Sequence, residues 1–387
     1  MIEPGSPRRL KAILAGLIVS TVALGTVAAV NQLQVRRLRA TVDGLADDVS
    51  RLQHTVARRD AEAAWPVSPL LMDYQLEVPG RGEIFPAMAS VEAPEYWPVA
   101  TLRVTNTADR AVAQTISAEI PDWSHRVERS VILGPRETIR VPIQPDLLPR
   151  AHENDQTRSA TLEVRAAGPD AAVLFVESRT VLIHGGAEIY WGRRFANAQV
   201  TARWVTPHDP SVLALVSAAR RYVPRGRLAG YSAGPDPAAV ESYVRAQAEA
   251  IFRALKRAGI SYVNSQFVLG EHVGQAQRIR LPSETLQLAS ANCMDVSVAF
   301  ASAAENLGLQ PLLVVVPGHA FAGVRLQRDA QEVLYFDLTV LPNGSFSAAV
   351  ARAKSWLKKT PPEKVLVVDV AAARIAGLYP LAPRRAA

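Results

Sequence analysis

The only cysteine of the chain, Cys293, is followed by a histidine and then by an aspartate, each in a distinctive local sequence. Cys293 stands in Asn-Cys-Met-Asp, His319 in Pro-Gly-His-Ala-Phe and Asp337 in Tyr-Phe-Asp-Leu-Thr. A thiolate nucleophile needs a base that takes its proton, and the base needs an acceptor that holds its ring in place. These three residues therefore predict a Cys-His-Asp catalytic triad.

The segment that contains Cys293 is expected to begin a helix. Asn292 can cap the free amides, Asp295 suits the third helical position, and apolar residues at helical spacing continue to Gly308. Cys293 then lies at the positive end of the helix dipole. This position stabilises a thiolate, so we expect the pKa of the thiol to fall below ~8.5.

Strands are expected to carry the other two members of the triad. The apolar run 312–316 predicts one strand, Pro317-Gly318 turns the chain, and His319 opens a second strand that continues to residue 324. A third strand over 333–339 carries Asp337. Side chains on neighbouring antiparallel strands lie a few ångströms apart, so the imidazole and the carboxylate can meet.

With these motifs, the stretch from about residue 200 to residue 380 resembles the bacterial transglutaminase-like domains of the papain-like cysteine superfamily. The resemblance covers roughly half of the chain and implies an α+β domain over 195–387. It also implies that Cys293 is the nucleophile, His319 the base and Asp337 the orienting residue. The matching segments are Cys293-Met294-Asp295, Asn306-Leu307-Gly308-Leu309-Gln310-Pro311, Val314-Val315-Val316-Pro317-Gly318-His319-Ala320-Phe321 and Phe336-Asp337-Leu338-Thr339.

A tetrahedral intermediate carries negative charge, so the site also needs an oxyanion hole. The backbone amide of Cys293 is the natural first donor, and related folds add a side-chain donor upstream of the cysteine. Gln277, Gln275 and Asn292 are the candidates for oxyanion or substrate contacts, and no spacing selects among them. The seven histidines show no paired ligand spacing and one cysteine cannot build a thiolate cage, so neither a metal nor another cofactor is expected.

The start of the chain predicts a membrane anchor. Residues 1–11 form a short basic tail, and residues 12–31 contain an uncharged run long enough to span a bilayer as a helix. A cleaved signal peptide is the alternative, although the apolar run exceeds the usual core of one. Arginines flank the run on both sides, so its charge asymmetry is slight. We expect a single-pass protein of the inner (plasma) membrane with its large domains outside the cytoplasm; the reversed topology is the alternative.

A stalk is expected to follow the anchor over residues 32–64. Valine and leucine alternate there at heptad positions a and d, the combination that favours parallel two-stranded coiled coils and predicts a homodimer. A single amphipathic helix is the alternative. The seam consists of Val35, Leu38, Val42, Leu45, Val49, Leu52 and Val56.

The middle of the chain, residues 68–187, predicts an antiparallel β-sandwich. Apolar and polar residues alternate over 100–105, 139–143 and 160–165, and one or two more strands are expected over 173–183, with turn residues between the segments. We see no catalytic cluster there. A spacer or a binding module is the expected role of this region.

The overall composition excludes one class of function. The chain of 387 residues has a formal net charge of +7 and a pI of about 9.7, but its basic residues are scattered and form no long run, so nucleic-acid binding is not expected. The first hypothesis is a cell-envelope cysteine hydrolase or acyltransferase that acts on amide bonds of peptide or protein substrates. The second is a non-catalytic envelope adaptor of the same architecture.

Overall fold

A computed structural model describes residues 71–80, 82–89, 91, 98–232, 234–263 and 276–382. The predicted anchor over residues 12–31, the predicted stalk over residues 32–64 and Gln275 lie outside these residues. Helices and strands both contribute substantially, which confirms the mixed α+β class. Within the described ranges, no helix is both long and apolar enough to cross a membrane.

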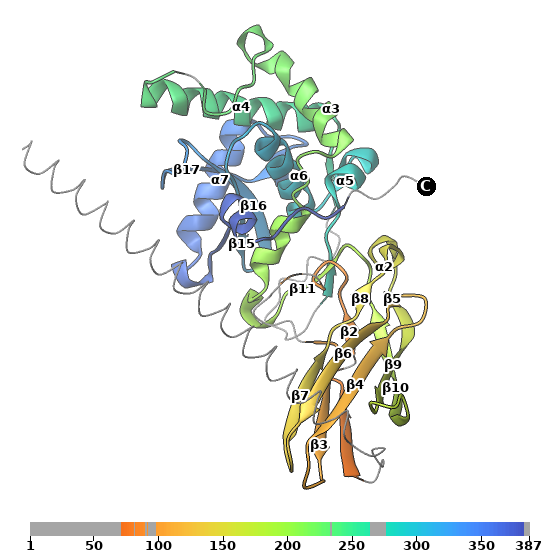
Figure 1. Ribbon diagram of the computed structural model, residues 1–387. Helices are drawn as coiled ribbons and strands as arrows, with labels where there is room; N and C mark the ends of the chain where they lie inside the picture. Colours follow the sequence, from red (N-terminus) through yellow and green to blue (C-terminus); the bar gives the residue numbers. More distant parts are fainter. Residues whose placement is uncertain are drawn as a thin grey trace, which may run out of the picture.

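Two sheets form the first region of the described chain, in the lower part of Figure 1. They share one apolar core, to which Leu102 and Val104 contribute from one sheet and Ile116, Leu162 and Val181 from the other. The smaller sheet is antiparallel and has the order β1 (Met72–Glu77), β3 (Ala100–Asn106), β7 (Thr138–Ile143). The larger has the order β2 (Glu83–Ile84), β10 (Val173–Ile183), β9 (Arg158–Ala167), β4 (Val112–Glu119), β6 (Val127–Leu133).

The strands predicted from alternating sequence are present in these sheets. In β3, every second residue is buried, as expected for a strand with one face on the core. One pairing departs from the predicted antiparallel arrangement, since the short strand β2 runs parallel to the end of β10. The same region also contains three smaller elements: β5 (Ser124–His125) pairs with β8 (Asp146–Leu147), and α2 (Pro149–Glu153) follows.

The second region surrounds a four-stranded antiparallel sheet that has helices on both faces. Its order is β17 (Val333–Phe336), β16 (His319–Arg325), β15 (Pro311–Val316), β18 (Leu366–Asp369). On one face, Ala322 and Val324 pack into a core shared with α6 (Cys293–Asn306). On the other face, Val314 and Phe321 pack against α7 (Phe346–Lys359).

The remaining elements of this region lie around α6. Asp209 and Asp236 cap α3 (Pro210–Ala219) and α4 (Pro237–Arg257), each with proline at the first helical position, as predicted. Both helices pack with α6 in one core. The other elements are β11 (Glu188–Tyr190), β12 (Ser261–Tyr262), β13 (Ala276–Arg278), α5 (Pro282–Leu288), β14 (Ser290–Ala291) and α8 (Val370–Ile375).

The two regions share a core where they meet, near β11 in Figure 1. Residues 85–88, which follow β2, pack into the apolar cluster that also contains Trp204, Cys293 and Met294. Met88 is fully buried there, and Arg203 donates a hydrogen bond to the carbonyl of Ala87. The two-sheet region is therefore more than a spacer, because it supplies part of the core that surrounds the candidate nucleophile.

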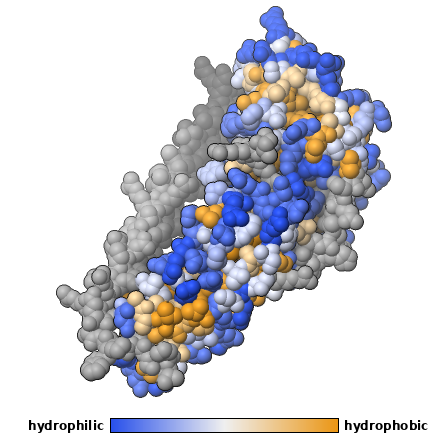
Figure 2. Space-filling model, turned by 90° about the vertical axis from the view of Figure 1, so that its right-hand side faces the viewer, coloured by the Kyte–Doolittle hydropathy of each residue, from blue (hydrophilic) through white to orange (hydrophobic). Residues whose placement is uncertain are grey.

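The outer surface is mixed in polarity. Figure 2 shows hydrophilic side chains over much of the visible face, with separate apolar patches on the two-sheet region below and on the helical region above. Val173 and Val176 of β10 are among the exposed large apolar residues of the two-sheet region. Scattered exposed apolar side chains of this kind are ordinary for a folded protein.

Candidate active site

The start of α6 is built as the sequence predicts. The side-chain oxygen of Asn292 accepts hydrogen bonds from the amides of Met294 and Asp295, both at 2.9 Å. The Asp295 carboxylate in turn accepts from the amides of Asn292, at 3.3 Å, and of Arg280, at 2.9 Å. This capping box fixes Cys293 as the first residue of the helix.

His319 and Asp337 come together as predicted, although Asp337 does not lie within a strand. β17 ends at Phe336, and Asp337 caps the 3₁₀ turn Leu338–Val340, so the predicted strand to residue 339 is too long. The reason is that the Asp337 carboxylate accepts a bond from the amide of Thr339, which turns the chain out of the sheet. His319 Nε2 lies 2.9 Å from Asp337 Oδ2.

The Asp337 carboxylate is fully buried and held by several donors. Thr339 donates to Oδ1 from its amide, at 3.0 Å, and from its hydroxyl, at 2.7 Å. Trp356 Nε1 donates to Oδ2 at 3.1 Å, and Arg352 Nε lies 3.0 Å from the same oxygen. Burial alone raises the pKa of this carboxyl, but the hydrogen bonds from His319 and Thr339 outweigh it and hold the pKa below its ordinary value.

The imidazole of His319 is fixed by two contacts. Its Nε2 faces Asp337, and its ring stacks on Trp356 with 4.7 Å between the centroids. Since Nε2 is committed to the carboxylate, Nδ1 is the nitrogen left to exchange a proton with a nucleophile. The Trp356 contact is absent from the sequence prediction, because nothing in the local sequence of α7 marks which residue meets the imidazole.

Cys293 is 1% exposed and lies against the backbone next to His319. The amides of Ala320 and Met294 donate toward its sulfur and favour the thiolate. Burial outweighs them and raises the pKa of the thiol to about 12. The expected lowering of this pKa is therefore wrong, because removal from water penalises the thiolate more than the helix N-terminus stabilises it.

Among the described residues, the thiol of Cys293 forms no hydrogen bond with the imidazole of His319. The predicted triad therefore consists of a hydrogen-bonded His-Asp pair and a neutral thiol that lies beside the backbone amide of Ala320, the residue after His319. Catalytic hydrogen bonds are often long in a protein without substrate and shorten in the reactive complex. The arrangement is compatible with a histidine that removes the proton during attack rather than before it.

Gln277 is the candidate oxyanion donor that the structure describes most fully. It is buried in β13, and its Oε1 accepts a hydrogen bond from Trp191 Nε1 at 2.8 Å. Its Nε2 is buried and has no hydrogen-bond partner in the described part of the chain. An unpaired buried donor is uncommon in proteins, which makes this amide group a candidate donor to a bound acceptor. Trp191, which donates to Gln277, and Ile279, two residues after Gln277, belong to the apolar cluster that contains Cys293.

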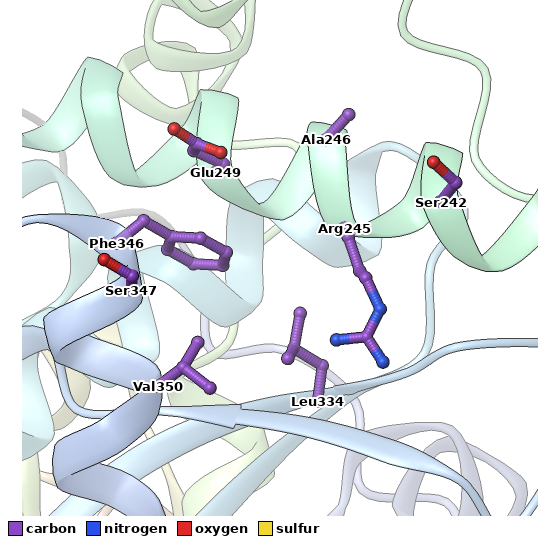
Figure 3. Close-up of a pocket in the computed structure, with 8 residues that line it drawn as sticks. All are labelled: Ser242, Arg245, Ala246, Glu249, Leu334, Phe346, Ser347 and Val350. Carbon is purple, nitrogen blue, oxygen red and sulfur yellow. The ribbon is translucent and has the colours of Figure 1, made fainter.

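A cavity of about 450 Å³ lies elsewhere in the same region, between α4, β17 and the first turns of α7 (Figure 3). Its walls include Arg245, Leu334 and Phe346, and the Arg245 side chain extends from α4 over Leu334. No cysteine or histidine lines it. Within the described ranges, no group of three potential metal-ligating side chains comes together.

Comparison with known families adds no assignment. No protein-family model matches the chain, and no curated protein matches it.

Proposed function

We propose that the chain is a cysteine hydrolase or acyltransferase that acts on amide bonds of peptides or proteins, and that its C-terminal region is transglutaminase-like. The observation that carries this proposal is the buried His319–Asp337 pair beside Cys293. The pair has one imidazole nitrogen bound to an ionised carboxylate and the other left for the thiol. Structural histidines are common in proteins, but a stacked histidine with a buried carboxylate beside the only cysteine fits acyl transfer best.

In this mechanism, the Cys293 sulfur attacks the substrate carbonyl while Nδ1 of His319 takes the thiol proton. Asp337 stabilises the resulting imidazolium. The backbone amide of Cys293 and the Nε2 group of Gln277 donate to the oxyanion. The tetrahedral intermediate then collapses to a thioester, the C–N bond breaks, and the imidazolium protonates the departing amine.

The second half of the reaction decides between the two activities. If water attacks the thioester, the carboxylic acid is released and the protein is a protease or an amidase. If an amine attacks, a new amide bond forms and the protein is an acyltransferase. Both use the same three residues, so Cys293, His319 and Asp337 do not distinguish them.

The test is formation of an acyl-enzyme. The full-length chain is incubated with peptide thioesters and p-nitrophenyl esters, and the intact mass is measured with and without an added primary amine. We expect an acyl adduct on the native protein and none on Cys293→Ala. For a hydrolase, the adduct should be lost in water alone. For a transferase, the adduct should be lost faster when the amine is present than when it is absent. Absence of any adduct from a folded native protein would refute the proposal.

A non-catalytic adaptor is the second candidate, and the observation that favours it is the burial of Cys293 with a pKa of about 12. Such a thiol is neutral at physiological pH, as an ordinary core cysteine is. Cys293→Ala separates the two candidates in cells. An enzyme loses its phenotype in this variant, whereas an adaptor keeps its phenotype as long as partner binding is intact.

We also propose that residues 12–31 anchor the protein in the plasma membrane and that the stalk 32–64 pairs two copies. The support is the uncharged run and the valine–leucine heptads of the sequence. A reporter fused after Ala387 tests the orientation. Activity of a reporter that works only outside the cytoplasm supports the proposed topology, and activity of a reporter that works only inside it supports the reverse.

A further inference from the structure

Tyr262 marks the solvent side of the candidate site. It lies in β12 and pairs with Ala291, two residues before Cys293. Tyr262 is 41% exposed, although Cys293 and Asp337 are buried. The pKa of Tyr262 is raised by partial burial and by the charges of Cys293 and Asp337, and lowered by Arg352, so the phenol lies within electrostatic reach of all three groups.

Arg352 connects the buried carboxylate of the site to this exposed side. Its Nε lies 3.0 Å from Asp337 Oδ2, yet its side chain is 54% exposed and that of Asp337 is not exposed at all. A guanidinium has five N–H donors in a rigid fork. The four on Nη1 and Nη2 have no hydrogen-bond acceptor among the described residues, so one edge of the fork is available to a ligand.

The exposed end of Arg352 leaves room for an anion. Its Nε lies 3.0 Å from the buried Asp337 carboxylate, and its terminal nitrogens lie beyond that contact. When His319 takes the thiol proton, the imidazolium and Arg352 are the positive charges, and Asp337 and the oxyanion formed by the attack are the negative ones. The carboxylate of Asp295, two residues after Cys293, lies 3.9 Å from Arg280. A substrate carboxylate at the exposed end of Arg352 would be attracted by the guanidinium and could accept hydrogen bonds from its terminal nitrogens.

We infer that the acyl donor carries a carboxylate and that Arg352 binds it through the terminal nitrogens of its guanidinium. Arg352 is thus a specificity-determining residue, and the substrate class is an acidic peptide or a related carboxylate-bearing amide. Planar carboxylates match the guanidinium fork in a bidentate geometry that a lysine ammonium does not reproduce. This inference rests on the proposed acyl chemistry at Cys293.

The sole cysteine allows a direct test with electrophiles instead of an unknown substrate. The probes are N-iodoacetyl derivatives of glycine, β-alanine and γ-aminobutyrate, each compared with its primary amide. Within each pair, the reactive group and the length are the same and only the negative charge differs. The alkylation rate of the full-length protein is followed by intact mass at low salt and at high salt.

We expect the carboxylate probe of the best-fitting length to react about twofold to fivefold faster than its amide, an effect in the range of an exposed charge pair. Arg352→Gln should bring the ratio to about one, and Arg352→Lys should restore it only in part. Lys354→Gln is the matched control, because it removes the same charge from an exposed position of α7. This control should keep the ratio.

The outcomes separate the inference from the proposed function. Rapid, His319-dependent alkylation with equal rates for acid and amide at every length overturns the carboxylate site and leaves the acyl chemistry standing. A second pair of results is a carboxylate preference that persists in Arg352→Gln or one that is lost equally in Lys354→Gln. Either result shows that the preference comes from general surface charge, and it also overturns the inference. Slow alkylation that does not depend on His319 rejects both.

Discussion

Removal of the imidazole in His319→Ala should leave Cys293 with a very low rate of alkylation. Burial raises the pKa of the group from 9.0 to about 12, so the fraction present as thiolate at neutral pH is about a thousandfold smaller than for an exposed cysteine. The thiolate is the species that reacts with alkylating agents. In His319→Ala, we therefore expect the rate with iodoacetamide to be about a thousandth of that of a cysteine peptide, and to rise about tenfold for each unit of pH.

The native protein should behave differently, because the imidazole can accept the proton as the sulfur attacks. General-base catalysis typically contributes about 10²–10⁴ in rate. We expect native Cys293 to be alkylated at least about 100-fold faster than in His319→Ala at pH 7, with a weaker dependence on pH.

The assay is intact-mass measurement over a pH series, and one cysteine means one adduct. His125→Ala, which removes an exposed histidine of the two-sheet region, is the matched control and should label as the native protein does. In denaturant, His319→Ala should regain the rate of an ordinary cysteine, which confirms that its thiol is intact. Equal rates for native protein and His319→Ala across the pH series would show that the imidazole does not serve the thiol.

Three further substitutions test the surroundings of the site. The pKa of Asp337 is lower in the folded protein than in the unfolded chain, so its carboxylate stabilises the fold above about pH 4. This stabilisation is lost as the pH falls through the pKa of the folded state. The difference in thermal midpoint between the native protein and Asp337→Asn should therefore shrink toward about pH 2. Asn292→Ala removes a buried cap and should cost about 1–2 kcal/mol in chemical unfolding, whereas Ser345→Ala, at an exposed cap, should cost less. Met88→Ala should lower the free energy of unfolding by about 2–5 kcal/mol and speed alkylation of Cys293. Met72→Ala, in the core of the two-sheet region, should also destabilise the protein but should not speed alkylation to the same extent. Equal increases in alkylation rate would contradict the shared core.

Local sequence is sufficient to predict the start of α6. Asn292 and Asp295 form a capping box with their own helix, and the residues that matter lie within four positions of one another. The strands of His319 and of the two sheets are also predictable, because alternating burial leaves a direct pattern in the sequence.

Contacts made through tertiary packing are not predictable in this way. Trp356 and Arg352 reach Asp337 from α7, and an amphipathic helix carries no sign of which residue meets a buried carboxylate. The pKa of Cys293 is predicted with the wrong sign for the same reason. The helix N-terminus is visible in the sequence, whereas the burial that outweighs it belongs to an apolar cluster that includes distant residues such as Met88.

The shared core of the two regions also bears on how the protein is made. Met88 and Met294 are about 200 residues apart in the chain and lie in one apolar cluster. Contacts of such long sequence separation form late in folding, and a chain that emerges from the ribosome exposes its N-terminal part first. A nascent chain therefore holds residues 85–88 without their full set of partners until the segment of Cys293 has been synthesised. An incomplete chain that stops before residue 293 has an open apolar surface at this position, which is the kind of surface that chaperones and proteases recognise.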